Sequence, residues 1–350
     1  MRVNLKQAAN LIRNCGTTNT FILRGRPGVG KSSILHMLSK ELPDYLPCYI
    51  DVANLDLGDL GMPVINKDTM ETHYAPNARF GIGANQHRPV LLMLDELGKA
   101  SRPVLNMLLP VILEKRFADR GLTTGSIIFA TTNLDTDGVG DNIPAHAYNR
   151  MSELIVAGPT VDEWLEWAAD NDIAPEIMAF AKQTSEVFQC YTDMSKNEKN
   201  PYIFNPKQHQ RSYVSPRSLA RASNIIKGRN RLTRNALITA LSGTIGESAA
   251  RDMVAYVEVS DSLPTWQEII DDPKGAKLPS SPAALNIMAF GALQRIDRST
   301  IGPWFEYLRR TPKELQSVFC LSGSKHPEKK KIMMTSGSFV TWMRDNQYLF

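Results

Sequence analysis

A glycine-rich segment between an apolar run and a helical pattern constrains this chain more than any other feature. Residues 25–32 read Gly-Arg-Pro-Gly-Val-Gly-Lys-Ser, a complete GxxxxGK[ST] match that follows TFILRG and precedes SSILHMLSKEL. Glycines let consecutive backbone amides face phosphate oxygens, and the helix N-terminus adds the positive end of its dipole. This context favours a true phosphate loop over a chance glycine-rich turn. The residues predicted to bind a nucleotide phosphate here are Gly25, Pro27, Gly28, Val29, Gly30, Lys31, Ser32 and Ser33.

Two side chains of this loop have specific predicted roles. Lys31 is expected to reach the β and γ phosphates, and Ser32 to bind Mg²⁺. Ser33 stands directly beside Ser32, so the metal ligand is assigned from the register of the motif alone.

A buried strand that ends in two carboxylates is the second predicted element of the site. The run Val-Leu-Leu-Met-Leu leads into Asp95 and Glu96. At the carboxyl end of such a strand one carboxylate can hold the metal while the next polarises the attacking water. We assign Asp95 to the metal and Glu96 to the catalytic base. The structural alternative is that these acids cap a following helix.

The fold class follows from apolar runs that alternate with helical patterns over the first 157 residues. Near-continuous apolar strands separated by helices predict a parallel sheet covered on both faces, hence an α/β unit. The predicted strands are TFILRG (20–25), CYIDV (48–52), VLLMLD (90–95), SIIFAT (126–131) and ELIVA (153–157).

The chain after residue 157 has helical patterns only. Thr160 and Glu163 form a predicted capping box at the start of the first helix. The breaker-rich stretch DDPKGAKLPSSP at 271–282 separates later helices from those before it. We predict a nucleotide-binding domain at 1–157, a helical lid at 158–260 and a small helical appendage at 261–350.

Composition excludes some classes and leaves others open. The chain is 43% hydrophobic and 22% charged, and it has no apolar run near the ~20 residues of a membrane helix. The N-terminus lacks a secretory apolar stretch, so we expect a cytoplasmic protein. Four dispersed cysteines predict buried free thiols rather than disulfides or a zinc site. A net charge of +4 neither requires nor excludes nucleic acid.

Taken together, these motifs resemble those of AAA+ ATPases, and more narrowly the MoxR-like group of bacteria and phages. The resemblance covers most of residues 1–265. Asn133, at the end of SIIFATTN, matches the first sensor that orients the attacking water. Arg150, in NIPAHAYNRMSELIV, matches the arginine finger that enters a neighbouring subunit's site. The tripeptide Ser215-Pro216-Arg217 matches the start of a lid helix, where Arg217 is the second sensor.

The structural alternatives for these three residues are ordinary ones. Asn133 could be a turn residue after a strand. Arg150 could be a surface arginine over a helix end, and Arg217 an exposed arginine on a capped helix.

The resemblance implies an ATP- and Mg²⁺-dependent hydrolase that works as a ring, usually a hexamer. It further implies a motor subunit that remodels or activates a partner protein. In this family the partner is frequently a protein with a von Willebrand factor A domain. The catalytic residues on this view are Lys31, Glu96, Asn133, Arg150 and Arg217.

Two other functions stay open. The first is a nucleic-acid remodeller, such as a loader, helicase-like motor or translocase. The second is an ATP-dependent scaffold with slow turnover, against which an intact Glu96 counts. Cations next to aromatic residues could contact a strand of nucleic acid, although solvated loop residues are the simpler interpretation. The residues concerned are Arg116, Arg120, Lys196, Lys199, Tyr202, Phe204, Lys207, Arg211 and Tyr213.

Overall fold

The computed structural model describes residues 2–83, 87–117, 120–134, 143–190, 199–205, 210–279 and 281–349. These residues form two compact units, 1–158 and 159–350. The chain passes from one to the other between Gly158 and Pro159, one residue beyond the predicted boundary. The predicted further division near residue 260 stays a prediction.

The first unit is built on a six-stranded parallel sheet of order β1-β10-β2-β9-β6-β3. β9 therefore lies between β2, which leads into the phosphate loop, and β6, which ends in Asp95. The strands are β1 (Arg2–Val3), β2 (Phe21–Arg24), β3 (Leu46–Asp51), β6 (Val90–Asp95), β9 (Ile127–Thr132) and β10 (Ser152–Val156).

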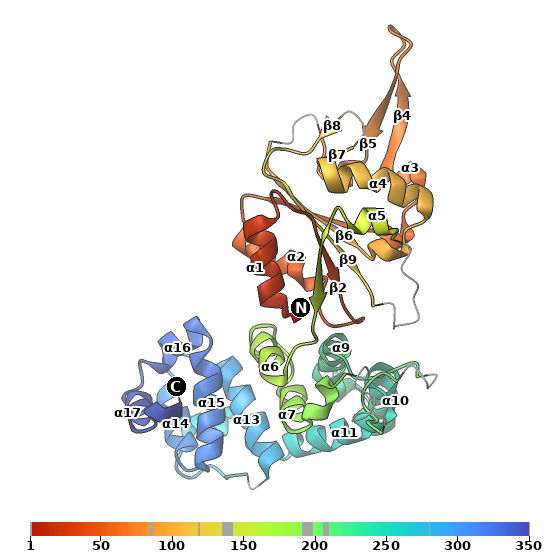
Figure 1. The fold of residues 1–350 in the computed structure, drawn as a ribbon. Helices are drawn as coiled ribbons and strands as arrows, with labels where there is room; N and C mark the ends of the chain where they lie inside the picture. The colour runs from red at the N-terminus through yellow and green to blue at the C-terminus, as the bar shows by residue number, and fades with distance from the viewer. Residues whose placement is uncertain are drawn as a thin grey trace. The chain divides into compact units, whose positions relative to one another are not determined.

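Helices cover both faces of this sheet (Figure 1). Alternate strand residues point to opposite faces, and the unit accordingly has two cores. Leu23, Met93 and Phe129 pack with helices α1 and α2, whereas Ile22 and Leu94 pack with α4. The flanking helices are α1 (Leu5–Cys15), α2 (Ser33–Glu41), α3 (Leu57–Leu60), α4 (Arg102–Glu114) and α5 (Ala145–Tyr148), with the short 3-10 turns η1 (Val52–Asn54), η2 (Ala78–Phe80) and η3 (Leu97–Lys99).

All five predicted strands are present, with ends shifted by at most two residues. The sequence did not predict β1, because two residues are too few for a periodic pattern. Two antiparallel hairpins leave the sheet. The hairpin of β7 (Arg116–Phe117) and β8 (Arg120–Gly121) lies between α4 and β9, and β4 (Gly61–Ile65) with β5 (Thr72–Pro76) forms the long projection in Figure 1.

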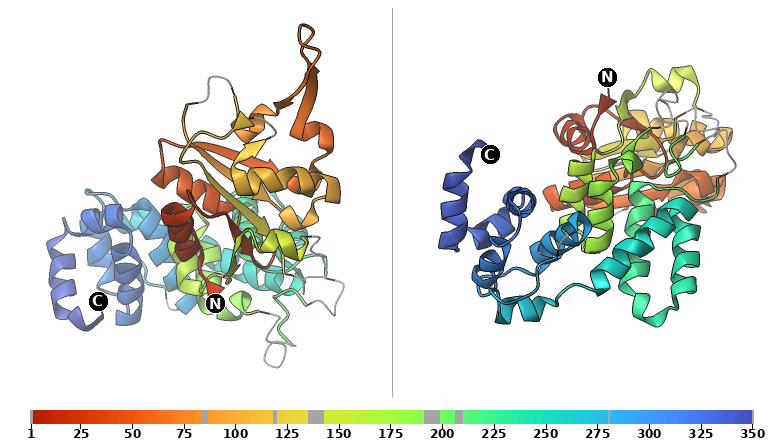
Figure 2. Two further views of the ribbon diagram at one scale, coloured as in Figure 1. Left: turned by 45° about the horizontal axis from the view of Figure 1, so that its top comes forward. Right: turned by 90° about the horizontal axis from the view of Figure 1, so that it is seen from below.

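The second unit contains only helices in its described part. Thr160 and Glu163 form the predicted capping box, and Ser215 caps the helix that begins at Pro216. Figure 2 shows the later helices in cyan to blue. Among the helices of this unit, α13 contacts both the earlier α7 and the later α15. The helices are α6 (Val161–Asp170), α7 (Pro175–Gln183), η5 (Ser185–Phe188), α9 (Pro216–Lys227), η6 (Arg229–Arg231), α10 (Arg234–Ile245), α11 (Glu247–Asp261), α12 (Trp266–Asp271), α13 (Pro282–Arg295), α14 (Ile301–Leu308), α15 (Lys313–Ser324), α16 (Pro327–Met333), α17 (Gly337–Asp345) and η7 (Gln347–Leu349).

This architecture confirms the predicted fold class, a P-loop αβα sandwich with a parallel sheet, followed by helical regions. In the described residues no helix is long and apolar enough to cross a membrane. Cys48 and Cys320 are buried, while Cys15 and Cys190 are partly exposed. The expectation of buried thiols is thus correct for two of the four.

A buried carboxylate in the second unit yields a stability prediction. Glu176 is 4% exposed; its Oε1 accepts from Ser260 Oγ at 2.8 Å and lies 3.2 Å from Arg229 Nη2. Arg229→Met removes the countercharge of a buried anion, so we expect the free energy of unfolding to fall by about 2–3 kcal/mol.

Urea unfolding followed by tryptophan fluorescence measures this, because all five tryptophans lie beyond residue 159. The control is Arg234→Met, which breaks the exposed 2.8 Å pair with Glu258 and should change stability by no more than about 0.5 kcal/mol. Equal effects of the two substitutions would contradict the interpretation.

Candidate functional site

The phosphate loop connects β2 to α2 through backbone conformations that suit glycine. Gly28 and Gly30 have φ values of 78° and 102°, which L side chains rarely adopt. A Cβ on Gly25 would lie 2.9 Å from the carbonyl oxygen of Val156, so this position too excludes a side chain. Ser32 is the N-cap of α2, and its own side chain makes no capping hydrogen bond. The amides of Ser33 and Ile34 donate to the carbonyl oxygens of Gly30 and Lys31, and the positive end of the α2 dipole lies at the end of the loop, where it favours an anion.

Lys31 is only 7% exposed, and its side chain folds back over the loop. Its Nζ donates to the carbonyl oxygens of Gly25 and Arg26 and, at 3.0 Å, to Oδ1 of Asn133. Three oxygen acceptors thus hold the ammonium at the mouth of the loop. The same charge can reach a phosphate by exchanging these acceptors for phosphate oxygens.

Ser32 and Asp95 meet, although 63 residues separate them. Ser32 Oγ donates to Asp95 Oδ2 at 3.1 Å. The neighbouring Ser33 instead donates to the carbonyl oxygen of Gly30 at 2.6 Å. A hydroxyl next to a carboxylate offers the oxygen ligands that Mg²⁺ prefers, and Mg²⁺ commonly keeps several waters beside one or two protein ligands. The donor set fits the predicted metal.

Two further hydroxyls, which the sequence did not predict, hold the Asp95 carboxylate. Tyr49 donates to Oδ2 at 2.9 Å, and Thr131 donates to Oδ1. Burial and the hydrogen bond to Asp95 raise the pKa of Tyr49 to about 12, so the phenol stays a donor at neutral pH. Asp95 itself is 8% exposed. Its orientation is therefore fixed by three donors from three different segments.

Glu96 has an unusual backbone for a non-glycine residue. Its φ and ψ are 57° and 39°, a left-handed conformation that costs about 1–2 kcal/mol. The backbone amide donates to Thr131 Oγ1 at 3.1 Å, while the side chain makes no capping bond to η3. Instead the carboxylate pairs with Lys99 Nζ at 2.6 Å and is 38% exposed. A carboxylate at the edge of the site is available to water, and the helix-cap alternative finds no supporting hydrogen bond.

The position of Asn133 depends on the strand order. Because β9 lies between β2 and β6, the residue after β9 emerges between the phosphate loop and Asp95. In register, Thr132 pairs with Arg24, the residue before the loop. The side-chain oxygen of Asn133 therefore accepts a hydrogen bond from Lys31. Its carbonyl oxygen accepts one from Arg24 Nε at 3.4 Å.

Thr131 supports both carboxylates at once, which leads to a second prediction. Its hydroxyl donates to Asp95 and accepts from the Glu96 amide. Thr131→Val keeps the shape and removes both bonds. We expect ATP turnover to fall by about ten- to a hundredfold, from two hydrogen bonds of about 1 kcal/mol each, with little change in ATP affinity.

Turnover and equilibrium binding are to be compared with those of Thr20→Val, which removes the hydroxyl of another buried threonine, bonded to Ile112 O at 2.7 Å. If Thr20→Val lowers turnover as much as Thr131→Val does, the effect is one of general stability and the positioning role is wrong.

The two predicted arginines lie outside this cluster. Arg150 follows α5, and Arg217 occupies the first turn of α9 in the second unit. Both are exposed, and neither has an ion pair within the described residues. Their predicted roles need a second subunit or the second unit, so they stay predictions.

Four of the nine residues considered for nucleic acid have contacts within the chain. Tyr202 OH donates to Asp252 at 2.8 Å, and its ring packs edge-on against Phe180. Phe204 and Tyr213 pack against each other at 5.1 Å. Arg116 lies 3.5 Å from Glu114, while Lys196 and Lys207 lie outside the described residues.

Comparison with known proteins gives no close relative. No family model matches the chain, and no curated protein matches it. Among solved structures, the RuvB Holliday junction branch migration motor of Thermotoga maritima is 15% identical over 77% of this chain and 74% of its own, with a TM-score of 0.38. NtrX from Brucella abortus in complex with ADP is 14% identical over 94% and 67%, with a TM-score of 0.39. These values describe a distant overall likeness, and the function proposed below rests on the site's own residues.

Proposed function

We propose that this chain is an ATP-hydrolysing subunit of the AAA+ class. The observation that carries the proposal is the meeting of Lys31, Ser32, Asp95 and Asn133 at the carboxyl ends of three adjacent strands. Ligands of open parallel sheets bind at this edge. A structural role alone does not explain a buried lysine at the mouth of a glycine-rich loop that leads into a helix N-terminus.

The triphosphate binds to the loop between Gly25 and Ser32. The loop amides and the N-terminus of α2 take up its negative charge, and Lys31 transfers from the carbonyl oxygens of Gly25 and Arg26 to the β and γ phosphates. Asn133, released by that lysine, is then free to orient a water. The site thereby changes its hydrogen bonding on binding without a change of fold.

Ser32 and Asp95 would hold Mg²⁺, and the metal would supply positive charge to offset that of the phosphates. Ser32 is favoured over Ser33 because only Ser32 contacts Asp95. Tyr49 and Thr131 keep the Asp95 carboxylate in place. Glu96 accepts the proton of the attacking water, for which its carboxylate must lie within hydrogen-bond distance of that water. To do so, the carboxylate must first give up its ion pair with Lys99.

We further propose that the subunits act as a ring, with Arg150 completing a neighbour's site and Arg217 closing the second unit over the nucleotide. Both arginines would stabilise charge on the γ phosphate. Their exposure and lack of ion pairs within the described residues support this assignment. A MoxR-like motor acting on a partner protein, such as one with a von Willebrand factor A domain, is the finer form of the proposal.

Mixing two inactive variants tests the shared site. Arg150→Ala has an intact phosphate loop, and Lys31→Ala has an intact Arg150. In head-to-tail rings of equal random mixture, about a quarter of the junctions combine both intact halves, so phosphate release should return to about a quarter of the wild-type rate. Arg102→Ala, at another exposed arginine, should keep full activity alone. A mixture no more active than its components would contradict an arginine supplied in trans.

A capture experiment tests the partner class. Glu96→Gln, expected to retain ATP, serves as bait with and without Mg-ATP, and the captured material is identified by mass spectrometry and nucleic-acid absorbance. A specific ATP-dependent protein supports the remodelling motor. Nuclease-sensitive nucleic acid without a protein would contradict it and support the nucleic-acid remodeller.

A further inference from the structure

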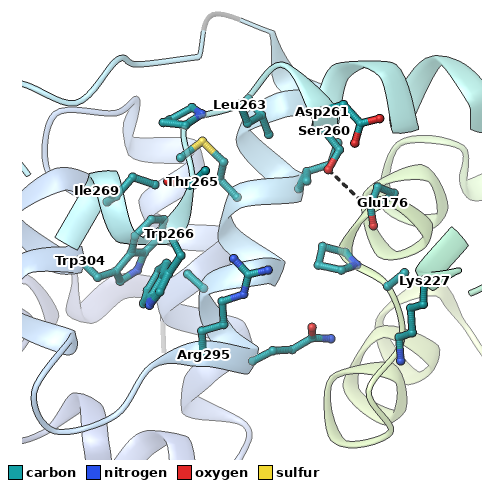
Figure 3. A pocket seen from close by; sticks show the side chains of 18 of the residues that line it. Glu176, Lys227, Ser260, Asp261, Leu263, Thr265, Trp266, Ile269, Arg295 and Trp304 are labelled. Atoms are coloured by element: carbon teal, nitrogen blue, oxygen red, sulfur yellow. Dashed lines mark hydrogen bonds between the residues drawn. The ribbon is translucent and has the colours of Figure 1, made fainter. Parts of the chain in front are cut away.

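The second unit contains a cavity of about 780 Å³ that includes none of the residues assigned to the nucleotide site. Small-ligand sites usually measure about 300–1,000 Å³ and combine apolar walls with a few polar groups. The lining comes from α7, the α9–η6 corner, α11, α12, α13 and α14, as Figure 3 shows from close by. The cavity thus has the size and the mixed lining of a binding site.

One end of the cavity is aromatic and holds a hydrogen-bond donor without an acceptor. The Trp266 and Trp304 rings lie 5.5 Å apart, and Ile269 and Met288 extend this apolar wall. Trp304 is 1% exposed, and its Nε1 has no acceptor among the described residues. A buried indole N–H normally finds a partner, and this one is covered by protein atoms behind the aromatic wall.

The charges in the cavity are paired with one exception. Lys227 pairs with Asp172 at 2.6 Å, and Arg229 with Asp261 at 2.7 Å. Arg295 has no such pair within the described part of the chain, and its side chain extends into the space between Trp266 and Glu176 (Figure 3). A guanidinium in this position is suited to a carboxylate.

Gly291 is an unexpected residue for its place in the wall. It lies inside α13, where glycine is a poor helix former. A Cβ there would meet only Pro175, at 3.5 Å, which is ordinary contact, so packing of the protein does not require glycine. What its missing side chain preserves is space in the cavity.

We propose that this cavity binds an amphipathic carboxylate, with an aromatic or branched apolar body against Trp266, Ile269 and Met288. Arg295 pairs with the carboxylate, and the Trp266 and Trp304 rings form the aromatic wall against which the apolar body packs. The same chemistry is offered by a free aromatic acid and by a peptide in which an aromatic residue adjoins Glu or Asp. The proposal does not depend on ATP binding in the first unit.

Two probe pairs test it with the full chain. The free-acid pair is 3-phenylpropionate and its uncharged amide; the peptide pair is acetyl-Phe-Glu-amide and acetyl-Phe-Gln-amide. The indole region of a ¹H–¹⁵N spectrum holds five tryptophan signals, and Trp304→Phe identifies the relevant one. We expect the Trp304 signal to shift with a charged probe at a Kd below about 1 mM and not with its uncharged partner. The charged probe that binds more tightly identifies the source.

Substitutions separate this site from general binding. Arg295→Gln should weaken the charged probe by about tenfold or more, since a hydrogen bond to a charged group is lost, whereas Arg298→Gln, at an exposed arginine outside the cavity, should not. Gly291→Leu should abolish the shift by filling the space, and Gly302→Leu, where a Cβ meets nothing within 4 Å, should leave it unchanged. Absence of any shift with both charged probes, or equal effects of Arg295→Gln and Arg298→Gln, would overturn the proposal.

Discussion

Lys31→Ala is expected to weaken ATP binding by at least about a hundredfold. The ammonium is buried and already held by three oxygen acceptors at the mouth of the loop. Charge-assisted hydrogen bonds are worth about 1.5–3 kcal/mol each, and two of them to phosphate oxygens correspond to a factor of about a hundred or more. Equilibrium titration with a slowly hydrolysed ATP analogue measures the loss.

The matched control is Lys40→Ala, at an exposed lysine on α2, the helix that follows the loop. This substitution also removes one positive charge but leaves the loop intact. The affinity of the variant for the ATP analogue should therefore stay within about twofold of wild type, as expected for a screened surface charge. If Lys31→Ala also binds the analogue within that range, the loop is not the nucleotide site.

Glu96→Gln is expected to separate binding from turnover. The substitution keeps the size of the side chain and removes its ability to accept a proton, which is worth about 10²- to 10⁴-fold in rate. The loop, Lys31 and Asp95 remain intact, so ATP affinity should be unchanged. Single-turnover phosphate release and equilibrium binding, measured on the same preparation, give both quantities.

Glu114→Gln, an exposed acid at the end of α4 in the same unit, serves as control and should retain the wild-type rate. Loss of ATP binding in Glu96→Gln would mean that this carboxylate supports the site rather than the reaction. An unchanged rate of phosphate release would mean that another residue is the catalytic base, and the adjacent Asp95 would be the next candidate.

The predictable part of the site was local in sequence. Gly25 to Ser32 and the strand ending in Asp95 each contain their own signal, because a phosphate loop and a buried strand need particular residues at fixed spacings. The five predicted strands are confirmed for the same reason. The register of the loop also placed Ser32, rather than Ser33, toward Asp95.

Tyr49 and Thr131 were missed because their roles depend on which strands are neighbours. Tyr49 reaches Asp95 only because β3 pairs with β6, and Thr131 only because β9 is inserted between β2 and β6. No pattern within a single strand encodes that order. The role of Thr131 can be inferred only when β9 is known to lie beside β6.

The β4–β5 hairpin was missed for a different reason. Both strands contain proline, and their side chains are largely exposed on both faces. Without one buried face there is no alternation of apolar and polar residues to detect. The unpaired indole of Trp304 and the space beside Gly291 are likewise tertiary features, which only the packed helices of the second unit define.

Mg²⁺-dependent phosphate release by the wild-type chain tests the central claim most directly. The account predicts multiple turnovers of ATP that stop when Mg²⁺ is chelated and that are absent from Lys31→Ala and Glu96→Gln prepared in parallel. Release at the same rate from the wild type and from both variants, or no release by the wild type at any protein concentration, would contradict it.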